Sequence, residues 1–186
     1  MTTKTAIKNK ILVYGVGNPG RQDDGLGPAL IAILEKKKAN LTLEAAYQLQ
    51  VEDSLLFSEQ DMVIIVDALK TGNKPFIFKK IKPKRDFTFT SHSLSAEAVA
   101  FLCQKLYERT PEVYILGIRG YEFNPGEKLS QKARSNLREA LAYLMELLRK
   151  PGLPKNSFDI IERASGRKAQ TGRKNHGKDK KRSPGA

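Results

Sequence analysis

The sequence predicts an α/β domain in three layers, in which a mainly parallel, twisted, five-stranded sheet lies between two layers of helices. Along the first 150 residues, segments with strand character alternate with segments whose apolar side chains recur at helical spacing. Two segments, Ile11–Val16 and Met62–Val66, are continuously apolar, which is typical of parallel strands buried on both faces. A chain of 186 residues is long enough for one domain with a sizeable core.

The strands are expected where apolar or alternating runs are short. Leu41–Leu49 alternates sufficiently for a strand, and Met62–Val66 is expected to end at Asp67. Pro75–Ile81 is expected at an edge of the sheet, because it contains a proline and lysines. The five expected strands cover Ile11–Val16, Leu41–Leu49, Met62–Val66, Pro75–Ile81 and Val113–Ile118.

The helices are expected between these strands. Pro28 is compatible with the first turn of a helix, and Ser130 is a suitable N-cap for the last one. The last helix carries Ala133, Leu137, Leu141, Leu144 and Leu148 on one face. The four expected helices cover Leu26–Lys36, Val51–Phe57, Ser95–Tyr107 and Ser130–Arg149.

A glycine-rich turn follows the first strand and carries an unusual charge. Gly15, Gly17 and Gly20 satisfy the pattern G-x-G-x-x-G, in which backbone N–H groups normally bind a phosphate. Here Asp23 and Asp24 stand where the phosphate would be placed, and carboxylates repel an anion. The turn therefore predicts a cation site, and the glycines are expected to serve the backbone geometry that orients Asp24.

Three ligand-type side chains are expected at one edge of the sheet. Open parallel sheets bind ligands at the carboxyl ends of their strands, where the chain reverses its winding direction. Asp24 follows the first strand, Asp67 follows the third, and His92 precedes a helix. Two carboxylates and one imidazole are suited to nickel, zinc, iron or manganese. Each residue taken singly is equally compatible with a structural cap or a hydrogen-bonded side chain.

No protein nucleophile accompanies this predicted site. The sequence contains no G-x-S-x-G or H-E-x-x-H motif, and Cys103 lies on a helical apolar pattern that indicates a core position. Ser91, Ser93 and Ser95 have the character of helix caps. Any hydrolysis would therefore depend on a metal ion that activates water or polarises a carbonyl group.

Half of the net charge of +13 lies in a C-terminal tail. Residues 151–186 contain ten Lys/Arg against three Asp/Glu, and beyond Arg163 they have no aliphatic side chain larger than alanine. We therefore divide the chain into an α/β domain, residues 1–150, and a basic tail, residues 151–186, which is expected to be disordered. The tail is expected to be a solvated extension, with docking on an acidic partner or weak nucleic-acid binding as the alternatives.

Composition also bears on the cellular setting. The chain has no uninterrupted apolar stretch of membrane-spanning length, so no membrane association is expected. Its N-terminus lacks the apolar core of a signal peptide, and its single cysteine cannot form an intrachain disulfide. We expect a cytoplasmic monomer that binds no specific nucleic acid.

Four segments resemble the [NiFe]-hydrogenase maturation endopeptidases. GVGNPGRQDDGLGP resembles the family's N-terminal signature, VIIVDA its second segment and SHSLS its histidine segment, while LGIRGYEFNPGEKLS is similar to the stretch before the final helix. The resemblance covers residues 10–150 in the same order and implies a phosphorylase/hydrolase-like fold. It places Asp24, Asp67 and His92 at the family's metal-binding and catalytic positions. Many members have glutamate at the first of these positions, and Ala46–Asp53 departs from the family's acidic, glycine-rich turn.

The resemblance also implies an activity. Members of this family, classed as aspartic-type proteases, remove a C-terminal extension from the [NiFe]-hydrogenase large-subunit precursor after nickel has been inserted. The nickel would be the substrate's own, and zinc or cadmium would replace it in vitro. Asp24, Asp67 and His92 would then bind the metal of the precursor, and cleavage would not start in its absence.

Two other functions compete with this one. GNPG after an apolar strand also resembles the start of bacterial peptidyl-tRNA hydrolase, an esterase, but this chain has no histidine between Gly20 and His92 to serve as its base. A non-enzymatic nucleotide-binding module would rest on G-x-G-x-x-G alone. Such a module has an acidic residue at the end of its second strand, where Leu49 and Gln50 stand here, with Glu52 and Asp53 slightly beyond.

Overall fold

The computed structural model describes residues 10–37, 39, 41–85 and 94–149 and contains a single five-stranded sheet. Its strand order is β2-β1-β3-β5-β4, in which all neighbours are parallel except β4 and β5. The predicted α/β class and the mainly parallel sheet are confirmed. The strands are β1 (Ile11–Val16), β2 (Thr42–Ala46), β3 (Met62–Leu69), β4 (Phe76–Lys80) and β5 (Glu112–Arg119).

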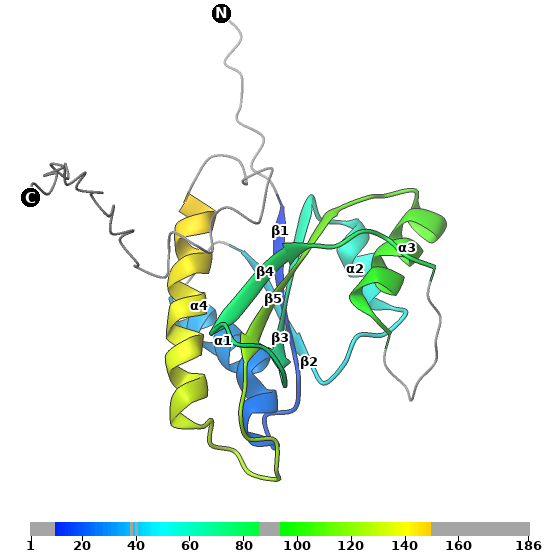
Figure 1. Ribbon diagram of the computed structural model, residues 1–186. Helices are drawn as coiled ribbons and strands as arrows, with labels where there is room; N and C mark the ends of the chain where they lie inside the picture. The colour runs from blue at the N-terminus through cyan, green and yellow to red at the C-terminus, as the bar shows by residue number, and fades with distance from the viewer. Residues whose placement is uncertain (1–9, 38, 40, 86–93, 150–186) are drawn as a thin grey trace, which may run out of the picture.

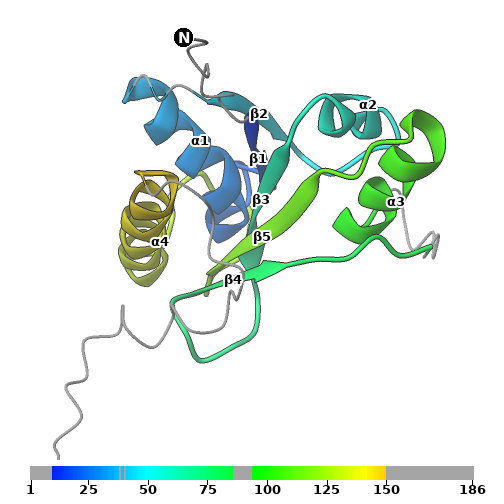
Figure 2. The ribbon, with the colours of Figure 1, turned by 90° about the horizontal axis from the view of Figure 1, so that it is seen from above.

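Helices cover both faces of this sheet, which gives the three predicted layers. Figure 2 shows α1 and α4 on one face, and α2 and α3 on the other. A short 3₁₀ helix, η1 (Gln22–Gly25), leads directly into α1. The α-helices are α1 (Leu26–Lys36), α2 (Asp53–Ser58), α3 (Ala96–Tyr107) and α4 (Gln131–Arg149). Among the described residues, no helix has the length and apolar character needed to cross a membrane.

The alternation of side chains along the strands produces two separate cores. Ile64 and Val66 of β3 pack with Leu30 of α1 and Leu144 of α4, whereas Ile65 packs on the opposite face among residues of α2 and α3. Cys103 belongs to the second core: it is fully buried, and its thiol donates to the carbonyl oxygen of Ser54. The core role predicted for Cys103 is confirmed, and burial raises the pKa of its thiol to about 11.

The outer elements differ slightly from the sequence prediction. β4 is an edge strand as predicted, and it runs antiparallel to β5. β2 is shorter than the predicted Leu41–Leu49, since its pairing with β1 runs only from Thr42 to Ala46. Ser95 is the N-cap of α3, and its hydroxyl accepts a hydrogen bond from the N–H of Ala98. Ser130 has the same role before α4, where its hydroxyl accepts a hydrogen bond from the N–H of Ala133.

The prediction that the third strand ends at Asp67 is wrong. Pairing between β3 and β5 continues through Asp67↔Gly117 to Leu69↔Arg119, so β3 extends three residues further than its buried apolar run. On the other side of β3, residues 67–69 do not pair with β1, because the β1–β3 register ends at Gly15↔Val66. Asp67 therefore lies inside a strand, at the point where the sheet opens beside β1.

This opening is the point at which the chain reverses its winding direction. The connection from β1 to β2 passes through α1 on one face, and the connection from β2 to β3 passes through α2 on the other (Figure 1). The carboxyl ends of β1 and β3 flank the reversal, which is where open α/β sheets bind their ligands. Asp24 follows the first of these strands, and Asp67 belongs to the second.

Three of our predictions fall on residues that the structure does not describe, and one of them is the helix-cap role of Ser91 and Ser93. The basic tail, 151–186, lies outside the described residues. So does His92, which belongs to the segment 86–93.

Candidate active site at the carboxyl edge of the sheet

The glycine-rich turn folds around the carboxylate of Asp24. An Oδ atom of Asp24 accepts a hydrogen bond from the backbone N–H of Asn18 at 3.0 Å. In a phosphate-binding turn, such an N–H group points at the ligand. Here the carboxylate of Asp24, and not a phosphate, accepts the hydrogen bond from this N–H group, as the negative charge of the turn predicts.

Gly17 makes this turn possible. Its φ of +135° lies in a region that only glycine adopts readily, and a Cβ there would overlap the backbone carbonyl oxygen of Asp24. Gly15 serves a different purpose, because a Cβ there would lie 2.6 Å from the carbonyl oxygen of Gly27 in α1. The predicted geometric role is therefore seen at Gly17, while Gly15 permits close packing of α1 on β1.

We expect Gly17→Ala to lower the free energy of unfolding by about 1–3 kcal/mol, through backbone strain and the clash with Asp24. Gly72→Ala is the matched control: Gly72 also has positive φ, +122°, but no atom lies within 4 Å of its would-be Cβ. Chemical denaturation measures both variants. If Gly17→Ala costs no more than Gly72→Ala, the turn does not depend on the close approach of Gly17 to Asp24.

The two adjacent aspartates have different roles. Asp23 is fully buried, and its carboxylate accepts hydrogen bonds from the backbone N–H groups of Tyr121 (2.7 Å), Glu122 (2.9 Å) and Ser130 (2.7 Å). The hydroxyl of Ser130 donates a fourth bond at 2.8 Å. Burial raises the pKa of Asp23, but these four bonds outweigh it and hold the pKa below its usual value. Asp23 therefore fastens the β5–α4 loop to the β1–α1 turn, and sequence reasoning did not separate it from Asp24.

Further backbone contacts support this attachment. The N–H of Gly126 donates to the carbonyl oxygen of Gly20, and the N–H of Gln22 donates to the carbonyl oxygen of Gly126. Figure 1 shows the β1–α1 turn and the β5–α4 loop beside each other at the lower end of the sheet. Segments about 100 residues apart thus form one rigid rim next to Asp24.

Asp67 is a partly buried carboxylate with a perturbed acidity. Burial, and secondarily the negative charge of Asp24, raise the pKa of Asp67 to about 6, against a single backbone hydrogen bond from Ala68 that lowers it. Asp24 follows β1 and Asp67 lies in β3, so both belong to the segments that flank the winding reversal. Perturbed acids of this kind are typical of functional sites.

Asp24 and Asp67 each retain an oxygen for a ligand. Asp24 accepts one hydrogen bond, from Asn18, and Asp67 accepts one, from Ala68; within the described part of the chain neither carboxylate accepts another. By contrast, both carboxylate oxygens of Asp23 accept hydrogen bonds. In the described ranges no group of three His, Cys, Asp or Glu side chains is close enough to hold a metal ion. Of the three predicted ligands, Asp24 and Asp67 lie within those ranges and His92 lies outside them.

A cavity of about 320 Å³ lies beside Asp67. Apolar side chains of the three central parallel strands form one side of it, and Tyr47 with Leu94–Ala96 forms another. The described chain resumes at Leu94, two residues after His92. The side chains from the three strands are Val16, Ile65 and Ile115. A cavity lined by both apolar and polar side chains, one of them a carboxylate, is a suitable site for part of a peptide substrate.

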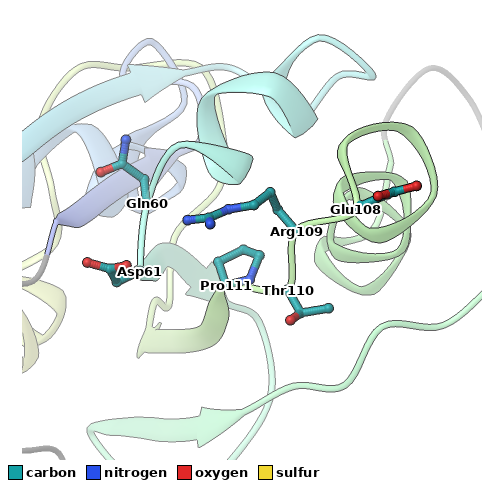
Figure 3. Close-up of a pocket in the computed structure, with 6 residues that line it drawn as sticks. All are labelled: Gln60, Asp61, Glu108, Arg109, Thr110 and Pro111. Carbon is teal, nitrogen blue, oxygen red and sulfur yellow. The ribbon is translucent and has the colours of Figure 1, made fainter.

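A second cavity, of about 250 Å³, lies at the opposite edge of the sheet, where β3 and β5 begin (Figure 3). Figure 3 shows Arg109 extending across it toward Gln60, and its Nε donates to the carbonyl oxygen of Ser58 at 3.2 Å. Asp61 accepts a bond from the N–H of Lys10. These polar groups connect neighbouring segments of the chain, and the cavity is remote from the winding reversal.

The acidic residue that a nucleotide-binding module would use is also engaged. Asp53 accepts hydrogen bonds from the hydroxyl of Tyr14 at 2.8 Å and from the N–H of Gln50 at 2.7 Å. Asp53 is the first residue of α2, and because its carboxylate is bound to Tyr14 and Gln50 it is not presented to a ribose. Together with the Asp24–Asn18 bond, this contact disfavours a nucleotide at the glycine-rich turn.

Known proteins resemble this chain in both sequence and fold. No protein-family model matches it. A protein of Methanocaldococcus jannaschii described as a hydrogenase maturation protease is 26% identical over 160 residues, which cover 77% of this chain and 99% of that protein. The chain is thus similar in sequence to a hydrogenase maturation protease. The resemblance inferred from the motif residues is thereby confirmed.

Solved structures of this family share the fold. The [NiFe] hydrogenase maturation protease HycI from Thermococcus kodakarensis superposes with a TM-score of 0.59 at 22% identity, over 78% of this chain and 96% of that one. The hydrogenase maturating endopeptidase HybD from Escherichia coli superposes with a TM-score of 0.57 at 21% identity, over 75% of this chain and 92% of that one. The shared architecture is the five-stranded α/β domain described above.

Proposed function

We propose that this protein is an endopeptidase that removes a C-terminal extension from a [NiFe]-hydrogenase large-subunit precursor, once nickel has been inserted. The observation that carries the proposal is the pair formed by Asp24 and Asp67 at the winding reversal, each with an oxygen that accepts no hydrogen bond from the described residues. The similarity to a hydrogenase maturation protease supports the proposed reaction class and kind of substrate.

In this proposal the nickel belongs to the substrate, and cleavage depends on its binding to the protein. Asp24 and Asp67 supply oxygen ligands, and His92 supplies the nitrogen ligand from the segment before Leu94. Three protein ligands leave coordination positions for the substrate's own groups, as a transient site requires. The metal supplies Lewis-acid polarisation of the scissile carbonyl group.

The acidity of Asp67 suits this role. With a pKa of about 6, its carboxylate is ionised at neutral pH and is therefore able to bind a cation. Desolvation that raises a carboxyl pKa also strengthens the attraction of its ionised form for a metal ion. The cavity beside Asp67 receives a side chain of the precursor next to the scissile bond.

Mass spectrometry of a processing reaction tests the proposal. The full-length chain is incubated with nickel-loaded and with nickel-free hydrogenase large-subunit precursor, and the products are weighed. We expect one cut near the C-terminus of the nickel-loaded precursor and none in the nickel-free precursor. Equal cleavage of both would contradict nickel dependence, and cleavage of neither would contradict the proposed function.

A further inference from the structure

A surface of cations and aromatic rings lies next to the carboxylate pair. Lys70 follows β3, Arg119 ends β5, and Lys132 lies in the first turn of α4. Asp67 pairs with Gly117, and Arg119 is two residues further along β5 on the same face of that strand. The basic aromatic patch, as we call this surface, consists of Lys70, Arg119, Tyr121, Phe123 and Lys132.

Cation–π contacts hold the patch together. The guanidinium of Arg119 lies 5.3 Å from the centre of the Tyr121 ring, and Nζ of Lys132 lies 5.5 Å from the same centre. Nζ of Lys70 lies 5.2 Å from the centre of the Phe123 ring. Such contacts orient the cations without neutralising them. The three positive charges consequently remain available to a partner.

The patch is also rigid. The side-chain amide of Asn136, a buried residue of α4, donates to the carbonyl oxygen of Arg119 at 2.9 Å and to the hydroxyl of Tyr121 at 3.2 Å. Asp23 fixes the backbone of Tyr121 from the other side. Because these bonds position the Tyr121 ring and the neighbouring backbone in advance, the protein loses little conformational freedom there when a ligand binds.

The cations of the patch lack carboxylate partners. Lys70, Arg119 and Lys132 form no ion pair with any carboxylate in the part of the chain that the structure describes, whereas Lys80 pairs with Glu112. One guanidinium nitrogen of Arg119, Nη1, is buried and has no hydrogen-bond acceptor there. A buried donor without an acceptor is costly, and a partner that reorganises this side chain and offers carboxylate oxygens would remove that cost.

We propose that the basic aromatic patch binds an acidic segment of the protein substrate next to the cleavage site; this rests on the proposed function. Three cations match a few carboxylates of a peptide, whereas a nucleic acid requires a longer track of charge. The rings of Tyr121 and Phe123 already have cations over them, so they are not open platforms for stacking bases. Charge complementarity therefore favours a polypeptide with Asp or Glu side chains.

Binding of a fluorescent, glutamate-rich peptide to the full chain tests this inference. We expect Lys70→Gln/Lys132→Gln to weaken binding about tenfold, because each exposed charge contact contributes up to about 1 kcal/mol. The matched control is Lys36→Gln/Lys79→Gln, which removes two exposed charges elsewhere and leaves the affinity unchanged within about twofold. The basic residues of 151–186 are present in all variants, so their contribution to the affinity for the peptide is the same in each.

Three results would overturn the inference: equal weakening in both double variants, no weakening in either, or an RNA oligonucleotide that binds more tightly than the peptide and loses this advantage in the patch variant. The processing reaction separates this inference from the proposed function. With a precursor that is cleaved, the patch variant raises KM and leaves kcat unchanged. If the unmodified chain cleaves no precursor, the proposed function fails, while the peptide measurement still decides whether the patch binds acidic segments.

Discussion

Asp67→Asn is expected to reduce cleavage of the nickel-loaded precursor by about 100-fold or more, because an amide is a poor ligand for a metal that supplies several kcal/mol of charge stabilisation. Asparagine has nearly the same shape and still accepts the hydrogen bond from the N–H of Ala68, so the fold is retained. The measurement is the initial rate of product formation by mass spectrometry. Asp61→Asn, at the opposite edge of the sheet, is the control and should leave the rate unchanged.

The same variant is expected to be more stable than the unmodified protein at neutral pH. The folded-state pKa of Asp67, about 6, exceeds the ordinary aspartate value of 3.8, so the folded state binds more protons between these values. The free energy of unfolding therefore falls as pH rises from 3.8 to 6. Above that range the full cost of the ionised, partly buried Asp67 is present. Removing the charge should recover about 1–2 kcal/mol at neutral pH after allowance for partial exposure. A variant that is both inactive and less stable would indicate a structural role for Asp67.

Asp23→Ala is expected to cause the largest loss of stability, about 3–5 kcal/mol, because it removes a buried carboxylate that accepts four hydrogen bonds. The N–H groups of Tyr121, Glu122 and Ser130 would lose their acceptor, and the β5–α4 loop would separate from the turn that carries Asp24. Thermal unfolding should show a decrease in Tm of about 10 °C.

Asp61→Ala is the matched control for this loss, since Asp61 accepts a single exposed hydrogen bond from the N–H of Lys10. Its cost should stay below about 1 kcal/mol. A similar Tm for Asp23→Ala and Asp61→Ala would show that the β5–α4 loop is held by other contacts.

The order of elements could be predicted because each one is encoded locally. Continuous apolar runs marked β1 and β3, and helical periodicity marked α1 and α4. The end of β3 could not be predicted, since its last three residues are held by pairing with β5, about 50 residues away. The antiparallel direction of β4 likewise depends on tertiary pairing and not on its own residues.

The candidate site could be predicted in part. Topology alone places Asp24 and Asp67 at the same edge of the sheet, and the structure agrees. The sequence could not distinguish Asp23 from Asp24, because the donors that bind Asp23 are about 100 residues distant in the sequence. The basic aromatic patch was also missed, since Lys70, Arg119 and Lys132 are ordinary surface cations until the fold brings aromatic rings beneath them.

A metal soak tests the central claim, that Asp24 and Asp67 are metal ligands at the winding reversal, most directly. Crystals of the full chain are soaked in nickel or cadmium, and anomalous diffraction is measured at the absorption edge of the metal. We predict anomalous density within coordination distance of the carboxylates of Asp24 and Asp67, with His92 as the third protein ligand. Density elsewhere on the protein, with these carboxylates empty at saturating metal, would contradict the claim.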